Sequence, residues 1–558
     1  ILENYLPNNN YQKPKELQKF DYKIVFRETE PITKVLLEDF TIDSGAVLSG
    51  SVNSNRSAIT AKLTANKVFL KSHEFKNVDF SINSNSDSLK SSLTTSSYRF
   101  FGFNSLDSFQ LDAQFHQGNF NLRSHWDGIN QEVNYGQLQV DAFFHDFDSL
   151  EAQFVNSYIS IEDSIWTIDS SNLVSIDGKN IDIQNFHLFN EAQDFRLNGK
   201  ISEQADDSLE LEIQNLNLSY LALLLPEESI KMSGIGDGNL LIKDAYNNFT
   251  LTSDLQFDSL KLNEVYIGEA YFKSDWLPGT SVLDVQGRLG KKSDNILVID
   301  GEVHPKRKSE SLNLDLVFND FPIVLLEPYI DEYLTDLSGT TSGTVEVNGE
   351  ASKPLLKGKL MLNKAGMRVN MLNTTYTITD EVIIQPDFIG VNNIKIVDEN
   401  GSEAYATGTV FHNNYSDLSL DIGLEYNNFL ALNTSSKDNE LYYGTAICSG
   451  NANISGFDDQ FIININATAL KGTDFKIPLN QGAEVSNSDF LVFTNSHKKE
   501  EKAIETIDLS GIQLNFDLEI EPEAKLQIIF DEQIGDILEA NGEGNLKLEI
   551  NTLGNFNI

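Results

Sequence analysis

Apolar and polar residues alternate with a period of two along most of the chain. The clearest run spans residues 512–520, where Ile512, Leu514, Phe516, Leu518 and Ile520 alternate with amides and acids. Successive side chains of a strand point to opposite faces of its sheet, so this pattern predicts strands with one apolar face and one polar face.

The same alternation recurs in several other runs, and their apolar positions are expected to line one shared surface. This predicted apolar face comprises Leu209, Leu211, Ile213, Leu312, Leu314, Leu316, Phe318, Leu418, Leu420, Ile422, Leu424, Leu514, Phe516, Leu518, Ile520, Leu546, Leu548 and Ile550. The chain is therefore expected to be all-β, with one-sided strands.

Helical signals are sparse and come in two similar places. Residues 221–226 and 321–328 each hold a short apolar run closed by proline, which predicts one turn of helix after a strand. Glycines follow both runs in the same order, Gly234 and Gly238 in one copy and Gly339 and Gly343 in the other. A weaker third copy ends at Gly450. This spacing indicates a repeat of about 100 residues, and stacked repeats form elongated bodies.

Turn chemistry favours antiparallel strands joined by hairpins. Asn-Gly and Asp-Gly pairs are strong hairpin signals, and the chain has them at 127–128, 177–178, 198–199, 348–349, 400–401 and 541–542. The charge-rich residues 495–502 predict a solvated loop between strands.

The length of 558 residues exceeds what one compact core supports, which is about 250–300 residues. We therefore expect a repetitive body in three regions: an N-terminal β region at 1–155, β repeats at 156–330 and a C-terminal β region at 331–558. The formal net charge of −42 repels phosphate backbones, so nucleic acid is not an expected partner.

Cysteine usage and hydropathy limit the covalent and membrane features of the chain. The one cysteine, Cys448, can form no internal disulfide and no cysteine-based metal cage. The longest purely apolar run, residues 221–225, is far shorter than the ~20 residues of a membrane-spanning helix. Because the chain also begins at Ile1 with no signal sequence, we expect a fragment whose membrane anchor lies in segments outside it.

No catalytic or metal-binding motif emerges from the sequence. The eight histidines are never spaced i, i+2 or i, i+4, and residues 290–293 lack the first glycine and the hydroxyl of a phosphate-binding loop. No Gly-x-Ser-x-Gly nucleophile elbow occurs, and acidic pairs are expected by chance among 83 carboxylates. Residues 398–403 lack calcium-loop spacing and predict a plain hairpin turn. We expect no enzyme activity, no cofactor and no bound metal.

From about Asn156 onward the chain resembles the C-terminal region of TamB proteins in the form found in Bacteroidota, within the AsmA-like, bridge-like lipid transfer superfamily. The stretches that carry the resemblance are residues 166–169, 195–201, 337–339, 349–358, 471–479, 488–493, 528–531, 534–536 and 542–546. TamB is the inner-membrane component of the translocation and assembly module.

The resemblance implies a curled, taco-shaped sheet with an open hydrophobic groove that spans the periplasm. It implies an N-terminal helix in the inner membrane, a BamA- or TamA-family barrel as partner at the outer membrane, and roles in phospholipid movement, outer-membrane biogenesis and protein assembly. Family sequences continue past the position of Ile558, so the docking strands are expected to lie beyond this chain.

The residues supply a mechanism that agrees with this family. If the sheet curls without closing and every strand turns its apolar side inward, acyl chains could lie in the trough and gain ~0.8 kcal/mol per buried CH₂ group. Headgroups would stay at the open seam. The alternative from the residues is that the same side chains pack together as a dry sandwich core.

Two other classes of protein share the alternating pattern. An outer-membrane β-barrel would turn its apolar side chains to lipid, but the aromatic residues here are scattered and form no girdle at strand ends. A structural or adhesive β-solenoid would have a filled interior and would carry no lipid.

Overall fold

The computed structural model describes residues 18–27, 40–56, 58–71, 73–99, 106–127, 135–146, 148–161, 164–223, 231–277, 279–291, 294–438, 442–457, 460–478, 512–531, 536–540, 543–551 and 556–557. The chain divides into two compact units, Ile1–Lys292 and Ser293–Ile558, and each is described by itself. The three regions expected from the sequence stay a prediction. Residues 488–493, the loop at 495–502 and the turn at 541–542 lie outside the described residues.

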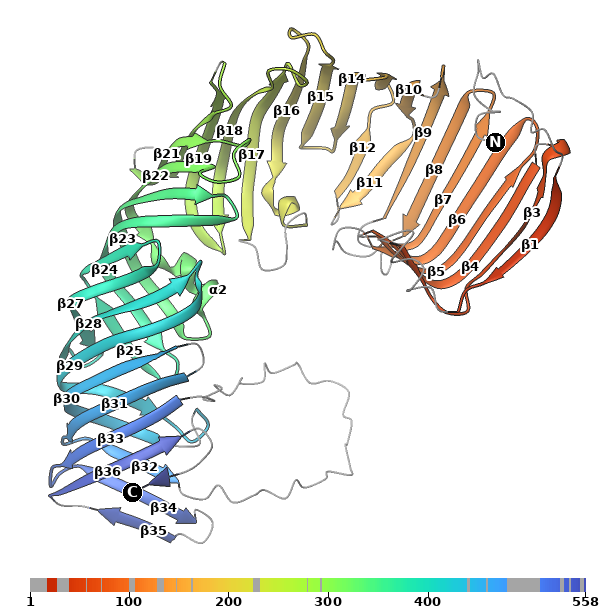
Figure 1. Cartoon of the computed structure of the whole chain (residues 1–558). Helices are drawn as coiled ribbons and strands as arrows, with labels where there is room; N and C mark the ends of the chain where they lie inside the picture. The colour runs from red at the N-terminus through yellow and green to blue at the C-terminus, as the bar shows by residue number, and fades with distance from the viewer. Residues whose placement is uncertain are drawn as a thin grey trace. The chain divides into compact units, whose positions relative to one another are not determined.

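The first unit is built almost entirely of strands. They are β1 (Lys19–Val25), β2 (Phe40–Ile42), β3 (Val47–Asn53), β4 (Ala58–Leu70), β5 (His73–Ser84), β6 (Ser88–Arg99), β7 (Leu106–His116), β8 (Asn119–Asp127), β9 (Gly136–Phe144), β10 (Ser149–Phe154), β11 (Ser157–Ile161), β12 (Ser164–Ile168), β13 (Leu173–Asp177), β14 (Asn180–Phe189), β15 (Asp194–Ile201), β16 (Ser208–Asn217), β17 (Met232–Lys243), β18 (Thr250–Leu262), β19 (Val265–Trp276) and β20 (Leu283–Lys291). Short 3₁₀ turns are η2 (Ser54–Arg56) and η4 (Leu218–Leu223). In Figure 1 the strands β3 to β9 follow one another as long antiparallel neighbours.

The described part of the second unit is also built almost entirely of strands. Its elements are β21 (Asp294–Val303), β22 (Leu312–Pro322), η5 (Ile323–Leu326), α2 (Glu327–Ile330), β23 (Leu334–Glu350), β24 (Lys353–Val369), β25 (Thr374–Ile378), β26 (Glu381–Gln385), β27 (Phe388–Asp398), β28 (Glu403–Asn413), β29 (Ser416–Thr434), β30 (Tyr443–Phe457), β31 (Gln460–Ala469), β32 (Asp474–Pro478), β33 (Ile512–Ile520), β34 (Lys525–Asp531), β35 (Asp536–Ala540), β36 (Gly544–Asn551) and β37 (Phe556–Asn557). The predicted all-β class and the curled, mixed sheet are confirmed.

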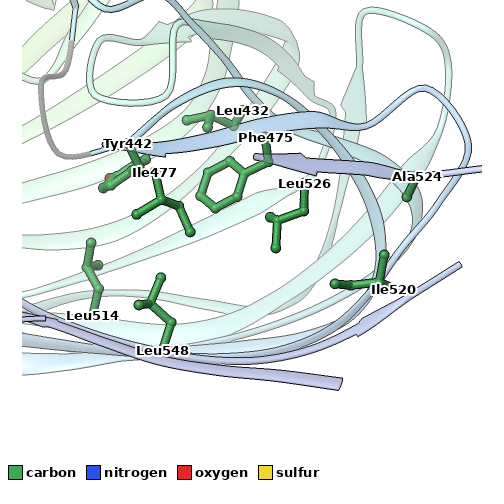
Figure 2. Packing of buried hydrophobic residues seen from close by; sticks show 9 residues of the cluster. All are labelled: Leu432, Tyr442, Phe475, Ile477, Leu514, Ile520, Ala524, Leu526 and Leu548. Atoms are coloured by element: carbon green, nitrogen blue, oxygen red, sulfur yellow. The ribbon is translucent and has the colours of Figure 1, made fainter. Parts of the chain in front are cut away.

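Towards its C-terminal end the second unit has two facing layers. We call the layer of β28, β31, β33 and β36 the first wall, and the layer of β25, β32 and β34 the second wall. Long strands belong to both: residues 419–426 of β29 pair with β28, whereas 429–434 pair with the start of β30, which pairs in turn with β32. Leu514 and Leu548 of the first wall face Phe475 and Leu526 of the second (Figure 2).

The long strands bend at bulges of one recurring kind. The bulged residue has a positive φ of 49–53°, and its N–H donates to the side chain of a polar residue that precedes a glycine in the next strand. The five donor–acceptor pairs are Asn185–Asn198 at 2.6 Å, Asn215–Asp237 at 2.8 Å, Asp320–Ser342 at 2.9 Å, Asn393–Thr407 at 2.9 Å and Asn428–Ser449 at 2.8 Å. We call these contacts bulge clasps. They satisfy an N–H group that the bulge removes from the ladder.

The repeat expected from glycine spacing corresponds to three of these clasps. Gly238, Gly343 and Gly450 lie opposite the last residue before the bulge, which is Ile213, Phe318 or Tyr426 in turn. Short helices follow the first two copies at η4, η5 and α2, close to the predicted positions. In the third copy β29 continues through the bulge without a helix.

Two hairpin signals were misleading. Gly178 and Gly401 occupy tight turns with positive φ, as predicted, and Asp398 accepts hydrogen bonds from Asn400 and Ser402 in the second of them. By contrast, Asn198-Gly199 lies inside β15 and Asn348-Gly349 lies inside β23. At Asn198 the side chain accepts a clasp hydrogen bond from Asn185, which gives the Asn-Gly pair a second structural use.

Two strand pairs near the C-terminal end of the second unit, β31 with β33 and β32 with β34, are parallel. Phe461 of β31 lies beside Ile512 of β33, and Asp474 of β32 lies beside Lys525 of β34, so both pairs are offset by the same number of residues. Backbone bonds join the two connecting turns, from Glu521 N to Ala469 O at 3.1 Å and from Lys525 N to Thr473 O at 2.9 Å. Because the two offsets are equal, β33 and β34 repeat the arrangement of β31 and β32 and lie beside them in the same order.

Candidate functional site: an apolar face along the sheet

Strand register brings the predicted apolar residues of the second unit onto one face. Residues directly opposite each other in neighbouring strands point to the same side of the sheet. One lateral row therefore runs through Leu297, Phe318, Gly343, Leu360, Val382, Val391, Gly408, Ile422, Ile454, Ile463, Leu514 and Ile550. Every member is aliphatic, aromatic or glycine, from β21 to β36.

A second row beside it has the same character. It runs through Ile299, Leu316, Val345, Gly358, Ile384, Ile389, Val410, Leu420, Gly456, Phe461 and Ile512. Leu312, Leu314, Leu424, Phe516, Leu518, Leu546 and Leu548 occupy shorter rows on the same face. Alternate residues such as Asp315, Asp421 and Asp517 are exposed on the other face.

The first unit carries a comparable row. It runs through Leu188, Phe195, Ile213, Gly238, Leu255, Phe272 and Gly287. Leu211 lies in the next row between Leu197 and Leu240, and Leu209 lies between Gly199 and Ile242. The three residues predicted in this unit thus share one apolar face.

Burial of the predicted residues changes along the sheet. In β16 and β22 they are half-buried, as expected for a surface that neighbouring side chains cover only in part. In the last strands Leu514 and Leu548 are buried, with 5% and 1% of their surface exposed. Leu418 lies at the start of β29, beside an irregularity in register, and is 39% exposed. It is set apart from the other members of the face.

Near its C-terminal end the face borders an apolar cavity of about 240 Å³. Among the predicted residues, Leu424, Leu514, Phe516, Leu518 and Ile520 line it. The second wall contributes Phe475 and Leu526, and β30 contributes Cys448. Two layers of apolar side chains thus enclose space that neither fills.

One cluster of buried residues at the same end includes members that line this cavity and two, Ile477 and Leu548, that do not. Ile477 is fully buried and Leu548 is 1% exposed, in a cluster with Leu432, Tyr442 and Phe475 (Figure 2). Here side chains of the two walls pack against each other. The second unit therefore combines a packed cluster with an adjoining cavity.

Sequence reasoning missed the second wall. Phe475 and Ile477 alternate with polar residues over only five positions, and Leu526 and Ile528 do so over a similarly short strand. The signal that could have found them is the constant offset between β31–β32 and β33–β34, which matches Phe475 with Leu526 and Ile477 with Ile528.

Polar groups at the cavity are few and mostly engaged. The Tyr376 hydroxyl donates to Leu430 O at 3.0 Å, and Thr473 Oγ1 donates to Ile447 O at 2.8 Å. Burial raises the pKa of the Tyr376 hydroxyl and raises the pKa of the Cys448 thiol to about 12, so both groups are neutral near pH 7. Lys525 lies at the edge and pairs with Glu539 at 3.1 Å.

The described residues also form ion clusters at the surface. His187 contacts Asp194, whose Oδ1 also lies 2.9 Å from Nη2 of Arg196, and these groups join β14 to β15 on the polar face. Across the described ranges, no group of three His, Cys, Asp or Glu side chains is arranged to hold a metal ion. Within those same ranges, no helix combines the length and the apolar character needed to span a membrane.

Comparison with known proteins gives one family. The sequence model of the TamB C-terminal domain matches residues 286–389 and 392–558. No curated protein and no solved structure matches the chain.

Proposed function

Because this chain belongs to the TamB family by virtue of its C-terminal half, which gives it a role in the translocation and assembly module, we propose that it conducts phospholipid acyl chains along its apolar face. The observation that carries the proposal is the unbroken lateral row from Leu297 to Ile550. A hydrocarbon chain that moves along such a row meets similar surface at each strand.

The energetics favour a path over a single tight site. Each CH₂ group that leaves water for an apolar surface gains ~0.8 kcal/mol, so a long acyl chain is held firmly anywhere along the row. Small steps between equivalent positions cost little, since the apolar surface that the acyl chain leaves at one strand is matched by similar surface at the next. The polar opposite face, with Asp315 and Asp517, keeps the outside of the sheet in water.

The family places the chain in the cell envelope and makes it a transport or assembly component that acts with an outer-membrane partner. The finer assignments are part of the proposal. In it the chain lies in the periplasm, is held at the inner membrane through a segment outside this sequence, and meets a BamA- or TamA-family barrel at the outer membrane. The cargo is phospholipid, and the protein performs no catalysis.

The test is the lipid content of the purified protein. The chain is purified without detergent, extracted with organic solvent and analysed by mass spectrometry beside an acidic control protein of similar size. The proposal expects phospholipid well above the control. Phospholipid at the control level would reject the conduit.

A second candidate function rests on the packed cluster around Ile477 and Leu548. In a purely structural β-solenoid such packing would extend along the whole interior. A solenoid of this kind would give no lipid in the extract, so the same measurement separates the two functions.

A further inference from the structure

We infer that an open hollow on the polar face of the second unit binds an extended glycan chain, with the ring of Tyr405 against one of its sugars. The polar and aromatic side chains that line the hollow come from three neighbouring strands and are Glu403 and Tyr405 of β28, Glu425 and Asn427 of β29, and Asn451 of β30. The hollow measures about 640 Å³, within the range of about 300–1,000 Å³ for small-molecule sites.

Strand register places these side chains on the face away from the apolar rows. Ala404 and Ala406 are buried on the apolar face of β28, so Tyr405 between them points to the other side. Glu425 lies directly opposite Tyr405, and Asn451 lies directly opposite Glu425. The site is therefore separate from the path proposed for acyl chains, and the inference does not depend on that path.

Tyr405 offers an apolar surface that is held in place but not covered. Its hydroxyl donates to Oε2 of Glu403 at 3.1 Å, and Glu403 also pairs with Lys395 of the next strand. The residue nevertheless keeps 41% of its surface exposed. An exposed and oriented aromatic ring is suited to stacking against the C–H face of a pyranose, which is the apolar side of a sugar.

The polar groups of the hollow include both donors and acceptors. The side-chain oxygens of Asn427 and Asn451 accept from Ser449 Oγ at 2.9 Å and from Asn466 Nδ2 at 3.2 Å. Within the described residues, no hydrogen bond engages the NH₂ groups of Asn427 and Asn451 or the carboxylate of Glu425. A ligand must therefore accept from amides and donate to a carboxylate. Sugar hydroxyls do both, whereas a simple anion or cation does only one.

The polar row beside the hollow favours an extended chain over a single sugar. From Tyr405 the row runs through Glu425, Asn451, Asn466 and Asp517 in successive neighbouring strands. Neighbouring strands lie about 4.8 Å apart, which is close to the length of one pyranose along an extended β-linked glycan. Successive sugars would therefore meet successive polar side chains. An α-linked glycan coils and loses this match.

The cell envelope, in which the family places the chain, contains a ligand of this kind. The glycan strands of the cell wall are long β-linked chains, and they are the occupant that we assign. The net charge of −42 disfavours strongly anionic polysaccharides as the alternative.

Calorimetric titration with chitohexaose, a β-linked hexamer of N-acetylglucosamine, tests the site. We expect saturable binding by the parent and an affinity at least about fivefold lower in Tyr405→Ala, because the stacking surface is lost. Tyr405→Phe keeps the ring and should stay within about twofold of the parent. Tyr271→Ala is the matched control, since Tyr271 is exposed on the polar face of the first unit and its hydroxyl donates to Asp254 at 3.3 Å. Absence of binding by the parent, or equal binding by Tyr405→Ala, would overturn the inference.

Two further ligands test the chemistry of the occupant. Maltohexaose, which is α-linked, should bind at least about tenfold more weakly than chitohexaose, and equal binding would contradict the match between sugars and strands. Hexalysine should not displace chitohexaose. Displacement by hexalysine that disappears in Glu425→Gln would show that the hollow is a site for basic peptides and would overturn the glycan assignment.

Sedimentation with purified cell-wall sacculi tests the source of the glycan. The parent and Tyr271→Ala should sediment with the sacculi, and the bound fraction should fall at least about fivefold in Tyr405→Ala. Binding of chitohexaose without sedimentation would reject the cell wall as the source. Tyr405→Ala should also keep the phospholipid content of the parent. Glycan binding by a protein that purifies without lipid would reject the conduit alone, and lipid without glycan binding would reject this site alone.

Discussion

The hydroxyl of Ser342 accepts a hydrogen bond of 2.9 Å from the backbone N–H of Asp320, at the bulge where β22 bends. Thr340 and Asn363 both donate to the Asp320 carboxylate, at 3.2 and 3.1 Å, so three strands meet at one residue. The same kind of clasp occurs at Asn215 and Asn428. The bends of the long strands therefore coincide with particular polar side chains.

Removal of one clasp should loosen its bulge locally. Ser342→Ala leaves the Asp320 N–H without an acceptor, which should cost about 1 kcal/mol and speed hydrogen exchange of that amide about fivefold. Ser352→Ala is the control, because Ser352 is exposed at the tip of the β23–β24 hairpin. Equal exchange of the Asp320 amide in both variants would show that the clasp contributes nothing to the bend.

The clasps also explain what could be predicted from the sequence. Period-two alternation identified one-sided strands and placed Leu314, Ile422 and Phe516 on one face, because that face follows from the two-residue period alone. Bulges break the period, since the extra residue shifts every later side chain. Asn198-Gly199 looked like a turn because Asn and Gly tolerate positive φ in turns and beside bulges alike. A polar residue before glycine, opposite Asn or Asp, is the pattern that would have distinguished them.

The candidate site was predictable on one side only. The first wall has long alternating strands, so Leu514 and Leu518 were found. The second wall has strands such as β32 with five residues, too short for a periodic signal. The second wall packs against the first through pairs of residues that are far apart in sequence, such as Phe475 with Phe516. Packing of that kind leaves no local pattern.

At Thr473 two side-chain hydrogen bonds replace part of the backbone hydrogen-bond ladder between strands. Its Oγ1 accepts from Ile447 N at 3.0 Å and donates to Ile447 O at 2.8 Å, with 6% of the residue exposed. Thr473→Val keeps the shape of the side chain but leaves the N–H and the carbonyl of Ile447 without a hydrogen-bond partner. This loss should destabilise the second unit by roughly 1–3 kcal/mol. Thr473→Ser keeps the hydroxyl and should lose much less. Urea unfolding of the two variants measures the difference, and equal midpoints would contradict it.

A charge on the apolar face should block lipid, whereas a charge on the polar face should not. Leu314 is half-buried between Gly301 and Val347, so Leu314→Glu places a carboxylate where acyl chains are expected to pass. A charge in a hydrocarbon environment costs about 2.5–3.5 kcal/mol, so the co-purified phospholipid should fall by more than about tenfold.

The matched control is Asp315→Asn on the other face of the same strand, which should leave the phospholipid content unchanged. Phe516→Glu compared with Asp517→Lys repeats the contrast in β33. An equal loss of lipid on both faces would contradict the facial assignment.

The buried thiol should show an unusual pH dependence of alkylation. Burial raises the pKa of Cys448 to about 12, and only the thiolate reacts with maleimides. Below this pKa the thiolate fraction grows about tenfold per pH unit, so the alkylation rate should keep rising from pH 7 to pH 10. A Cys448→Ala, Ser352→Cys variant carries one exposed thiol, with an ordinary pKa of about 8.5, and its rate should level off above about pH 9. The measurement is the second-order rate constant with N-ethylmaleimide. A plateau for Cys448 near pH 9 would mean that the thiol is open to water and that the cavity around it is not dry.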